Sequence, residues 1–215
     1  MKLPPVPFLY PIIDTAVCDA RGLNAATIAD AYLAGGARLL QLRDKSGSSA
    51  AFLSLAEHIV RRASAFDAAV IVNDRADVAR LSGAHGVHVG QEDLAVSDVR
   101  RIVGFSFIVG LSTHDERQVD EALDSEATYV AVGPVFGTST KETGYSARGL
   151  DLVRYAAGRG KPVVAIGGIT LQRAPSVVHA GAAGLAVISD LLEGGNPEAR
   201  AGEFIARLAE PFFME

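Results

Sequence analysis

Short apolar runs rich in β-branched residues alternate with segments of helical periodicity along nearly the whole of this 215-residue chain. The apolar runs predict strands at residues 8–13, 38–42, 69–72, 86–89, 107–111, 129–132, 162–166 and 184–188. The segments between them predict helices at residues 24–33, 49–65, 76–81, 96–102, 115–123, 150–157, 171–180 and 198–208. Strands that read as continuous Val, Ile and Leu runs are typical of parallel sheets buried on both faces. Eight βα units with short connections therefore predict one α/β domain over residues 1–215, folded as a (β/α)8 TIM barrel.

Composition and charge exclude several classes of protein. With a net charge of −5, nothing in the composition indicates nucleic-acid binding by bulk electrostatics, so an anionic ligand would need a local basic site. No uncharged apolar run approaches the length of a membrane span. Cys18 is the only cysteine, which excludes an internal disulfide and a cysteine-based zinc site. The first eleven residues contain four prolines and lack the apolar core of a secretory signal. We therefore expect a cytoplasmic protein without a nucleic-acid or membrane partner, and the sequence leaves its oligomeric state open.

Polar residues gather directly after the predicted strands. They are Arg43 and Lys45 after the second strand, Asn73 and Asp74 after the third, Asp93 after the fourth, Ser112 and His114 after the fifth, residues 138–141 after the sixth, Gly167 and Gly168 after the seventh, and Ser189 after the eighth. In a (β/α)8 barrel the carboxyl ends of all strands meet at one rim, where enzymes of this fold build their active sites. The pattern therefore predicts an enzyme with its site at that rim.

Asp74 and Asp93 follow neighbouring strands, so both carboxylates can face one ion. Two carboxylates, completed by phosphate oxygens and water, are a common way to hold Mg²⁺. A single aspartate in such a position more often caps the following helix. The pair, together with the cations Arg43, Lys45 and Lys141, favours a magnesium site that binds a diphosphate.

The segment 132–144 lacks the periodicity of a strand and is rich in Gly, Pro and hydroxyl-bearing residues, with Lys141 near its end. A lysine beside hydroxyl and amide donors suits an anionic substrate, although a polar surface loop has the same composition. The segments 165–170 and 184–189 predict a second, monophosphate site, because barrels often bind a phosphate at the loops after their last two strands. A tight turn that requires glycine explains Gly167 equally well.

Two histidines and a pair of arginines have simpler interpretations. His88 lies within a predicted strand and is interpreted as a hydrogen-bonded core residue. His114 is a candidate general base, or a residue that orients its loop or binds substrate. The pair Arg100 and Arg101 is interpreted as the solvated face of a helix.

Together these clusters resemble the thiamine phosphate synthase family, whose members are (β/α)8 barrels. The resemblance rests on Gln41-Leu-Arg-Asp-Lys45, Val72-Asn-Asp-Arg75, Gly86-Val-His-Val-Gly-Gln-Glu-Asp93, Gly110-Leu-Ser-Thr-His114, Gly133-Pro-Val-Phe-Gly-Thr-Ser-Thr-Lys141, Ala165-Ile-Gly-Gly-Ile-Thr170 and Ile188-Ser189. These segments follow one another in the family's order across strands two to eight. Single motifs among them are weak, but the ordered set is specific.

The resemblance implies transfer of an aminopyrimidinylmethyl group from its diphosphate to the nitrogen of a thiazole phosphate or its carboxylate, with release of pyrophosphate and formation of thiamine phosphate. It implies Mg²⁺ as the cofactor, held by Asp74 and Asp93. The pyrimidine diphosphate is then expected at Gln41, Arg43, Lys45, Asn73, Ser112 and Lys141, and the thiazole phosphate at Thr138, Thr140, Gly168, Ile188 and Ser189. The expected catalytic residues are Arg43, Lys45, Ser112 and Lys141; the three cations would stabilise charge that develops on the leaving group.

Three alternatives remain open at this stage. A thiazole tautomerase, a paralogue within the family, shares the barrel and the Asn-Asp-Arg stretch at 73–75 but carries out no diphosphate chemistry; Asp93 and Lys141 favour the synthase over it. A non-catalytic binder of thiamine precursors would need the phosphate sites but not two carboxylates. An unrelated phosphate-binding isomerase would need an acid and a base on opposite sides of its substrate, and the sequence offers no such pair.

Overall fold

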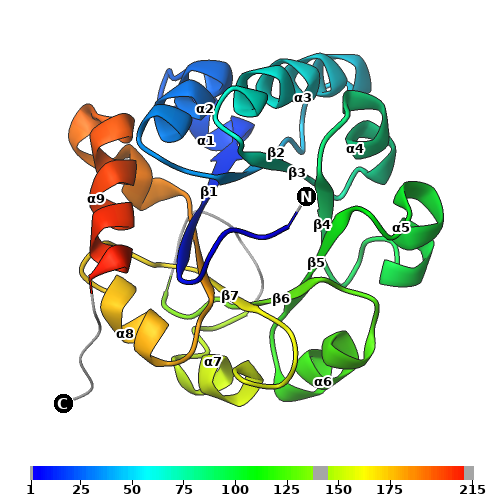
Figure 1. Ribbon diagram of the computed structural model, residues 1–215, viewed down its shortest axis with the longest axis vertical. Helices are drawn as coiled ribbons and strands as arrows, with labels where there is room; N and C mark the ends of the chain where they lie inside the picture. Colours follow the sequence, from blue (N-terminus) through cyan, green and yellow to red (C-terminus); the bar gives the residue numbers. More distant parts are fainter. Residues whose placement is uncertain (1, 138–144, 211–215) are drawn as a thin grey trace.

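Eight parallel strands form a closed barrel, and helices surround it (Figure 1). The computed structural model describes residues 2–137 and 145–210. The strands are β1 (Phe8–Asp14), β2 (Leu39–Arg43), β3 (Ala69–Asn73), β4 (Gly86–Val89), β5 (Ile108–Thr113), β6 (Tyr129–Val132), β7 (Val163–Ile166) and β8 (Gly184–Val187). Each strand pairs in parallel with the next, and β8 closes the ring on β1. The prediction of a (β/α)8 barrel is confirmed.

The strands are apolar along their whole length because both of their faces are buried. In β1, Phe8, Tyr10 and Ile12 belong to the cluster inside the barrel, whereas Leu9 and Ile13 belong to the larger layer between the sheet and the helices. This alternation follows from the period of two along a strand. Inward-facing polar residues therefore have no contact with solvent except near the ends of the barrel.

The helices are α1 (Thr15–Ala20), α2 (Ala25–Ala34), α3 (Ser49–Ser64), α4 (Ala76–Ser82), α5 (Val96–Val103), α6 (Glu116–Asp124), α7 (Asp151–Ala156), α8 (Ala174–His179) and α9 (Pro197–Ala209), with a 3-10 segment, η1 (Ser189–Gly195). The sequence pattern predicts neither α1 nor η1. The other boundaries differ from their predicted positions by at most three residues, at the start of α8. Within residues 2–137 and 145–210, no helix combines the length and the apolar character needed to cross a membrane.

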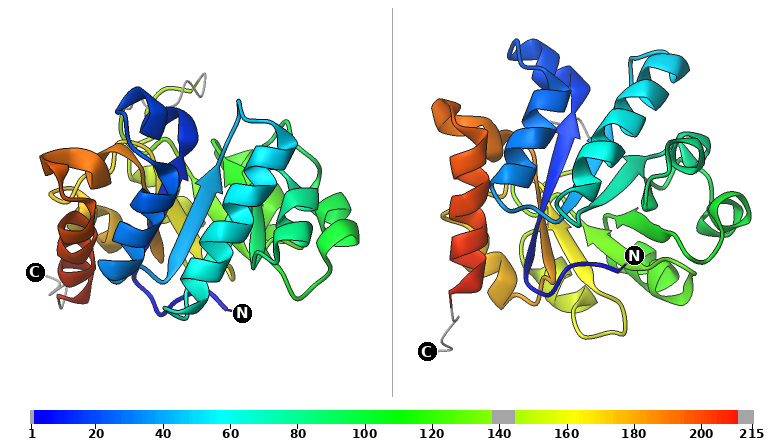
Figure 2. Two further views of the ribbon diagram at one scale, coloured as in Figure 1. Left: turned by 90° about the horizontal axis from the view of Figure 1, so that it is seen from above. Right: turned by 45° about the horizontal axis from the view of Figure 1, so that its top comes forward.

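The two ends of the barrel differ in what covers them. The residues before β1 lie at the end where the strands begin, while α1 lies at the opposite end, where the strands stop (Figure 2). The carboxylate of Asp14 caps α1 by accepting a hydrogen bond from the backbone N–H of Val17 (3.3 Å). The unpredicted helix α1 therefore lies at the rim that carries the candidate site.

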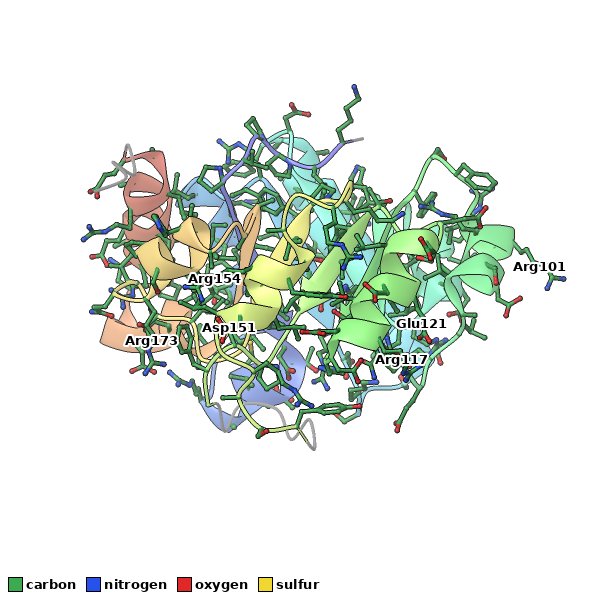
Figure 3. All side chains as sticks on the ribbon, turned by 90° about the horizontal axis from the view of Figure 1, so that it is seen from below. Arg101, Arg117, Glu121, Asp151, Arg154 and Arg173 are labelled. Atoms are coloured by element: carbon green, nitrogen blue, oxygen red, sulfur yellow. The ribbon has the colours of Figure 1, made fainter. Side chains whose placement is uncertain are left out.

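The prediction that Arg100 and Arg101 are both solvated is wrong for Arg100. Arg100 is only 7% exposed. Its guanidinium donates to the carbonyls of Glu126, Gly104 and Phe107 and to the hydroxyl of Thr128. Arg101 is solvated as expected, with a side chain 83% exposed that points away from the molecule (Figure 3). Arg100 therefore ties the end of α5 to the chain segments that precede β5 and β6.

Candidate active site

The described candidate residues all lie toward the carboxyl ends of the strands. Gln41 and Arg43 lie in β2 with Lys45 just beyond it, Asn73 ends β3 and Asp74 follows, Asp93 lies after β4, Ser112 lies in β5, Gly168 follows β7, and Ile188 and Ser189 follow β8. Because all strands are parallel, these positions meet at one rim. Thr138, Thr140 and Lys141 lie outside the described residues.

Lys45 and two carboxylates form a charged cluster above the ends of β2, β3 and β4. The ammonium group of Lys45 forms an ion pair with Asp74, whose side chain is 17% exposed. Burial raises the pKa of the Asp74 carboxyl, and hydrogen bonding with Asp93 and repulsion by it add to this rise, while Lys45 opposes it. Asp93 is held in turn by the backbone N–H of Gly90 (2.7 Å). The carboxyl groups of Asp74 and Asp93 therefore lie in contact with each other.

The backbone at Asp74 is strained as well. Its φ of 61° lies in the left-handed region, which residues other than glycine seldom adopt, and its N–H donates to the carbonyl of His88 (2.7 Å). Such strain persists where the surrounding structure imposes it, and it gathers at functional sites. The strained turn directs the start of the β3–α4 connection across to β4.

The cluster fits a divalent cation that shares its coordination with a substrate. Among the described residues, no three His, Cys, Asp or Glu side chains gather closely enough to hold a metal by themselves. Mg²⁺ usually needs only one or two protein carboxylates, because water and phosphate oxygens complete its octahedron. A cation between Asp74 and Asp93 would also offset the repulsion that raises the pKa of Asp74. The two carboxylates therefore suit Mg²⁺ bound together with a phosphate.

Arg43 is positioned by a residue that the sequence analysis did not single out as functional. Its guanidinium donates to the carboxylate of Asp14, and the two side chains are 16% and 5% exposed. The Nε atom of Arg43 is buried and has no hydrogen-bond partner among the described residues. Asp14 thus fixes the direction of the guanidinium. The one signal in the sequence was the position of Asp14 at the end of the first strand.

A chain of hydrogen bonds crosses the barrel interior beneath the rim. It runs from Gln41 Nε2 to Tyr10 Oη (2.9 Å), from Tyr10 Oη to Tyr129 Oη (3.0 Å), from Tyr129 Oη to His88 Nδ1 (2.9 Å), and from His88 Nε2 to Ser112 Oγ (2.8 Å). We call these five residues the interior chain. The interpretation of His88 as a hydrogen-bonded core residue is correct. Tyr10 and Tyr129 were missed, although their inward positions follow from the period of two along their strands.

The loops after β6 and β7 pack directly against each other. The N–H of Phe136 donates to the carbonyl of Gly167 (3.0 Å). Gly167 and Gly168 have φ values of 101° and 60°, and a Cβ atom on either would lie 2.6 Å from the neighbouring loop, at Pro134 and Gly137 respectively. Both positions therefore require glycine for steric reasons, which supports the tight-turn explanation for Gly167. Gly168 can contribute only backbone groups to a ligand.

The loops after β7 and β8 are joined by Asp190. Its carboxylate accepts the N–H of Leu171 (3.2 Å) and pairs with Arg200 of α9 (2.8 Å). Ile188 and Ser189 lie immediately before Asp190, at the start of η1. These bonds fix the backbone of the two loops on which a monophosphate site was predicted.

His114 is held by the backbone of the following βα loop. Its Nδ1–H donates to the carbonyl of Gly133 (2.6 Å), and its ring stacks on Tyr145 with the centroids 4.1 Å apart. Its own N–H donates to the side chain of Gln118 (2.8 Å). These contacts support the interpretation that His114 orients its loop.

Known proteins match this chain over most of its length. A family model described as thiamine monophosphate synthase matches residues 9–191, which include every candidate residue from Gln41 to Ser189. The thiamine-phosphate synthase of Koribacter versatilis is 43% identical over 204 residues, covering 93% of this chain and 95% of that protein. The thiamine-phosphate synthase of Roseiflexus castenholzii is 42% identical over 202 residues, covering 91% and 88%.

A solved structure agrees with these relatives. The thiamine phosphate pyrophosphorylase from Pyrococcus furiosus superposes with a TM-score of 0.85 at 28% sequence identity. The superposition covers 94% of this chain and 95% of that protein. The similarity therefore extends over the whole barrel rather than over one motif.

Proposed function

Because the chain belongs to the thiamine monophosphate synthase family, we propose that its rim joins a pyrimidine diphosphate to a thiazole phosphate as a transferase. In this reaction the bond between the methylene carbon of the pyrimidine and the diphosphate oxygen breaks, and its electron pair leaves with pyrophosphate. The thiazole nitrogen forms the new bond to the methylene carbon, which gives thiamine phosphate. The observation that carries the proposal is the cluster of Lys45, Asp74 and Asp93 beside Arg43, which suits a diphosphate leaving group with its metal.

Asp74 and Asp93 would hold Mg²⁺, which supplies positive charge to the leaving diphosphate when it is bound. Lys45, which pairs with Asp74 in the structure, would contact a phosphate oxygen, since Mg²⁺ would neutralise that carboxylate. Arg43, directed by Asp14, and Lys141 would add positive charge around the pyrophosphate. Charge that builds up on the leaving oxygens would thereby be stabilised at a fixed site, and such electrostatic stabilisation is usually the largest single contribution to catalysis.

Gln41, Asn73 and Ser112 would hold the pyrimidine ring, and the thiazole phosphate would bind at Thr138, Thr140, Gly168, Ile188 and Ser189. The fixed backbone of the loops after β7 and β8 supports the second assignment. Holding both rings at one rim keeps the thiazole nitrogen close to the methylene carbon and raises its effective concentration. The mechanism requires no nucleophile from the protein.

The test is an assay of the purified chain with both precursors and Mg²⁺, in which thiamine phosphate and pyrophosphate are quantified. We expect the two products in equal amounts and their loss when EDTA removes the metal. Interconversion of thiazole carboxylate phosphate isomers without metal and without thiamine phosphate would contradict the proposal and indicate the tautomerase. Binding of both precursors without any product would indicate a non-catalytic binder.

A further inference from the structure

The short helix α1 lies between the two proposed phosphate sites at the rim. It follows β1, whose neighbours in the closed sheet are β2 on one side and β8 on the other. The proposed diphosphate site includes the end of β2, and the proposed monophosphate site includes the residues after β8. The hydrogen bonds at the two ends of α1 therefore decide whether this helix connects the two sites.

The amino-terminal end of α1 holds the segment 43–45, which carries two of the proposed diphosphate-binding cations. Asp14, which caps α1, accepts a hydrogen bond from the guanidinium of Arg43. Thr15, the first residue of α1, donates through its hydroxyl to the carboxylate of Asp44 (3.0 Å). Two consecutive residues at the start of α1 thus bind two consecutive residues at the end of β2. A ligand that restrains the segment 43–45 therefore restrains the start of α1 as well.

The carboxyl-terminal end of α1 holds the 3-10 segment that follows β8. Arg21 is the C-cap of α1, and its backbone N–H donates to the carbonyl of Cys18 (3.0 Å). Its guanidinium donates to the carbonyl of Leu192 (3.3 Å) and forms an ion pair with Glu193 (2.9 Å), both in η1. Because η1 starts at Ser189, Arg21 binds the element that carries part of the proposed monophosphate site.

Both elements are anchored in the layer between the sheet and the helices. Cys18 of α1 is 2% exposed and Leu191 of η1 is 0% exposed, and both belong to that layer. Asp190 of η1 extends the contacts to the segment after β7, because its carboxylate accepts the N–H of Leu171. The contacts therefore run without a break from Arg43 through α1 and η1 to the segment after β7. Energetic coupling between two sites can be carried by such contiguous contacts.

We propose that Arg21 is a positioning residue that couples the two sites, so that a diphosphate bound beside Arg43 increases the affinity of the rim for the thiazole phosphate. The first ligand restrains the path from Arg43 to η1, which lowers the entropy cost of ordering η1 for the second ligand. The coupling is reciprocal, because both ligands share one thermodynamic cycle. The inference rests on the proposed function, because it assumes that both ligands bind at this rim.

The test measures the dissociation constant of the thiazole phosphate by calorimetry, without and with saturating pyrophosphate and Mg²⁺. Pyrophosphate replaces the pyrimidine diphosphate, so that no reaction takes place, and the ratio of the two constants is the coupling factor. Arg21→Ala removes both contacts with η1, and Glu193→Ala removes only the ion pair. Arg62→Ala is the matched control, because its pair with Asp30 joins the outer surfaces of α3 and α2. Thermal unfolding of each variant shows that it is folded.

We expect a coupling factor of about five in the wild type and in Arg62→Ala, because an exposed ion pair changes an equilibrium by about fivefold at most. The side chains of Arg21 and Glu193 are 37% and 59% exposed. Arg21→Ala should bring the factor to about one, and Glu193→Ala to an intermediate value, because the bond to the carbonyl of Leu192 remains. The affinity for each ligand alone should stay within about twofold of wild type in every variant.

An undiminished coupling factor in folded Arg21→Ala would overturn the inference. A loss of affinity for each ligand alone, with the factor unchanged, would also overturn it, because it would indicate that Arg21 only stabilises η1. If the wild type binds both ligands without coupling, the inference fails while the proposed function stands. If the wild type binds both ligands with coupling but forms no thiamine phosphate, only the proposed reaction fails. If it binds neither ligand, the proposed function and the inference fail together.

Discussion

Asp14 combines two tasks in one buried carboxylate. One oxygen caps α1 through the N–H of Val17, and the other accepts from Arg43. A guanidinium in a partly buried position needs such a partner, because an unpaired charge is costly to keep away from water. The same pairing limits the directions in which Arg43 can point.

Replacing this carboxylate tests its contribution to stability. Asp14→Ala should lower the free energy of unfolding by about 2–4 kcal/mol, because it removes a helix cap and leaves Arg43 unpaired. Denaturant unfolding measures the change. Asp30→Ala is the control, since the Asp30–Arg62 pair is solvent-exposed and should contribute below about 1 kcal/mol. Equal losses in the two variants would show that Asp14 and Arg43 form an ordinary surface pair.

Cys18 gives a prediction on pH. Burial raises the pKa of its thiol to about 11, and the carboxylates of Asp14 and Asp19 add to the rise. A raised thiol pKa keeps the group protonated at neutral pH, so the reactive thiolate forms only as the pH rises toward that value. Alkylation by iodoacetamide at pH 8 should therefore be about 100-fold slower in the native protein than in the denatured chain. Equal rates in the two states would contradict the assigned environment.

At the scale of elements, the connections between helices and strands depend on a few buried side chains. Arg100 makes five hydrogen bonds that tie α5 to the segments before β5 and β6. Its neighbour Arg101 forms only an exposed pair with Asp98 within the same helix. Of these two adjacent arginines, only Arg100 is expected to contribute substantially to the free energy of unfolding.

This difference can be measured directly. Arg100→Ala should lower the free energy of unfolding by about 3 kcal/mol, because three backbone carbonyls lose a charged donor. Arg101→Ala should change it by less than about 0.5 kcal/mol. Thermal and denaturant unfolding of both variants provide the comparison. A similar effect of the two substitutions would contradict the burial assigned to Arg100.

The elements that the sequence predicted are those with a local signal. Hydrophobic periodicity located all eight strands and eight of the helices, because it reflects burial of whole faces. It missed α1, in which Cys18 is the buried residue, and η1, whose backbone leaves helical geometry at Glu193 and Gly194. It also could not separate Arg100 from Arg101, because the difference between them comes from carbonyls that approach only in the folded barrel.

At the scale of the whole molecule, closure of the barrel brings together residues that are distant in the sequence. The position of polar residues after strands correctly placed the candidate residues that the structure describes at one rim, because all strands are parallel, but it did not single out Asp14. The interior chain could not be predicted in this way. Its link between Tyr10 and Tyr129 joins residues 119 positions apart, and it depends on the register of the closed sheet. Asp14 and Arg43 meet for the same reason.

In the proposed reaction, departure of pyrophosphate depends on a metal held by Asp74 and Asp93, which come together from the ends of β3 and β4. The most direct measurement is the rate of pyrophosphate release by Asp74→Asn and Asp93→Asn under saturating precursors and Mg²⁺. Asp98→Asn, on the outer surface of α5, is the control. We expect at least about a 100-fold loss in the first two variants, a rate within about twofold of wild type in the third, and melting temperatures that stay close to that of the wild type. Turnover near the wild-type rate in folded Asp74→Asn and Asp93→Asn would contradict the account.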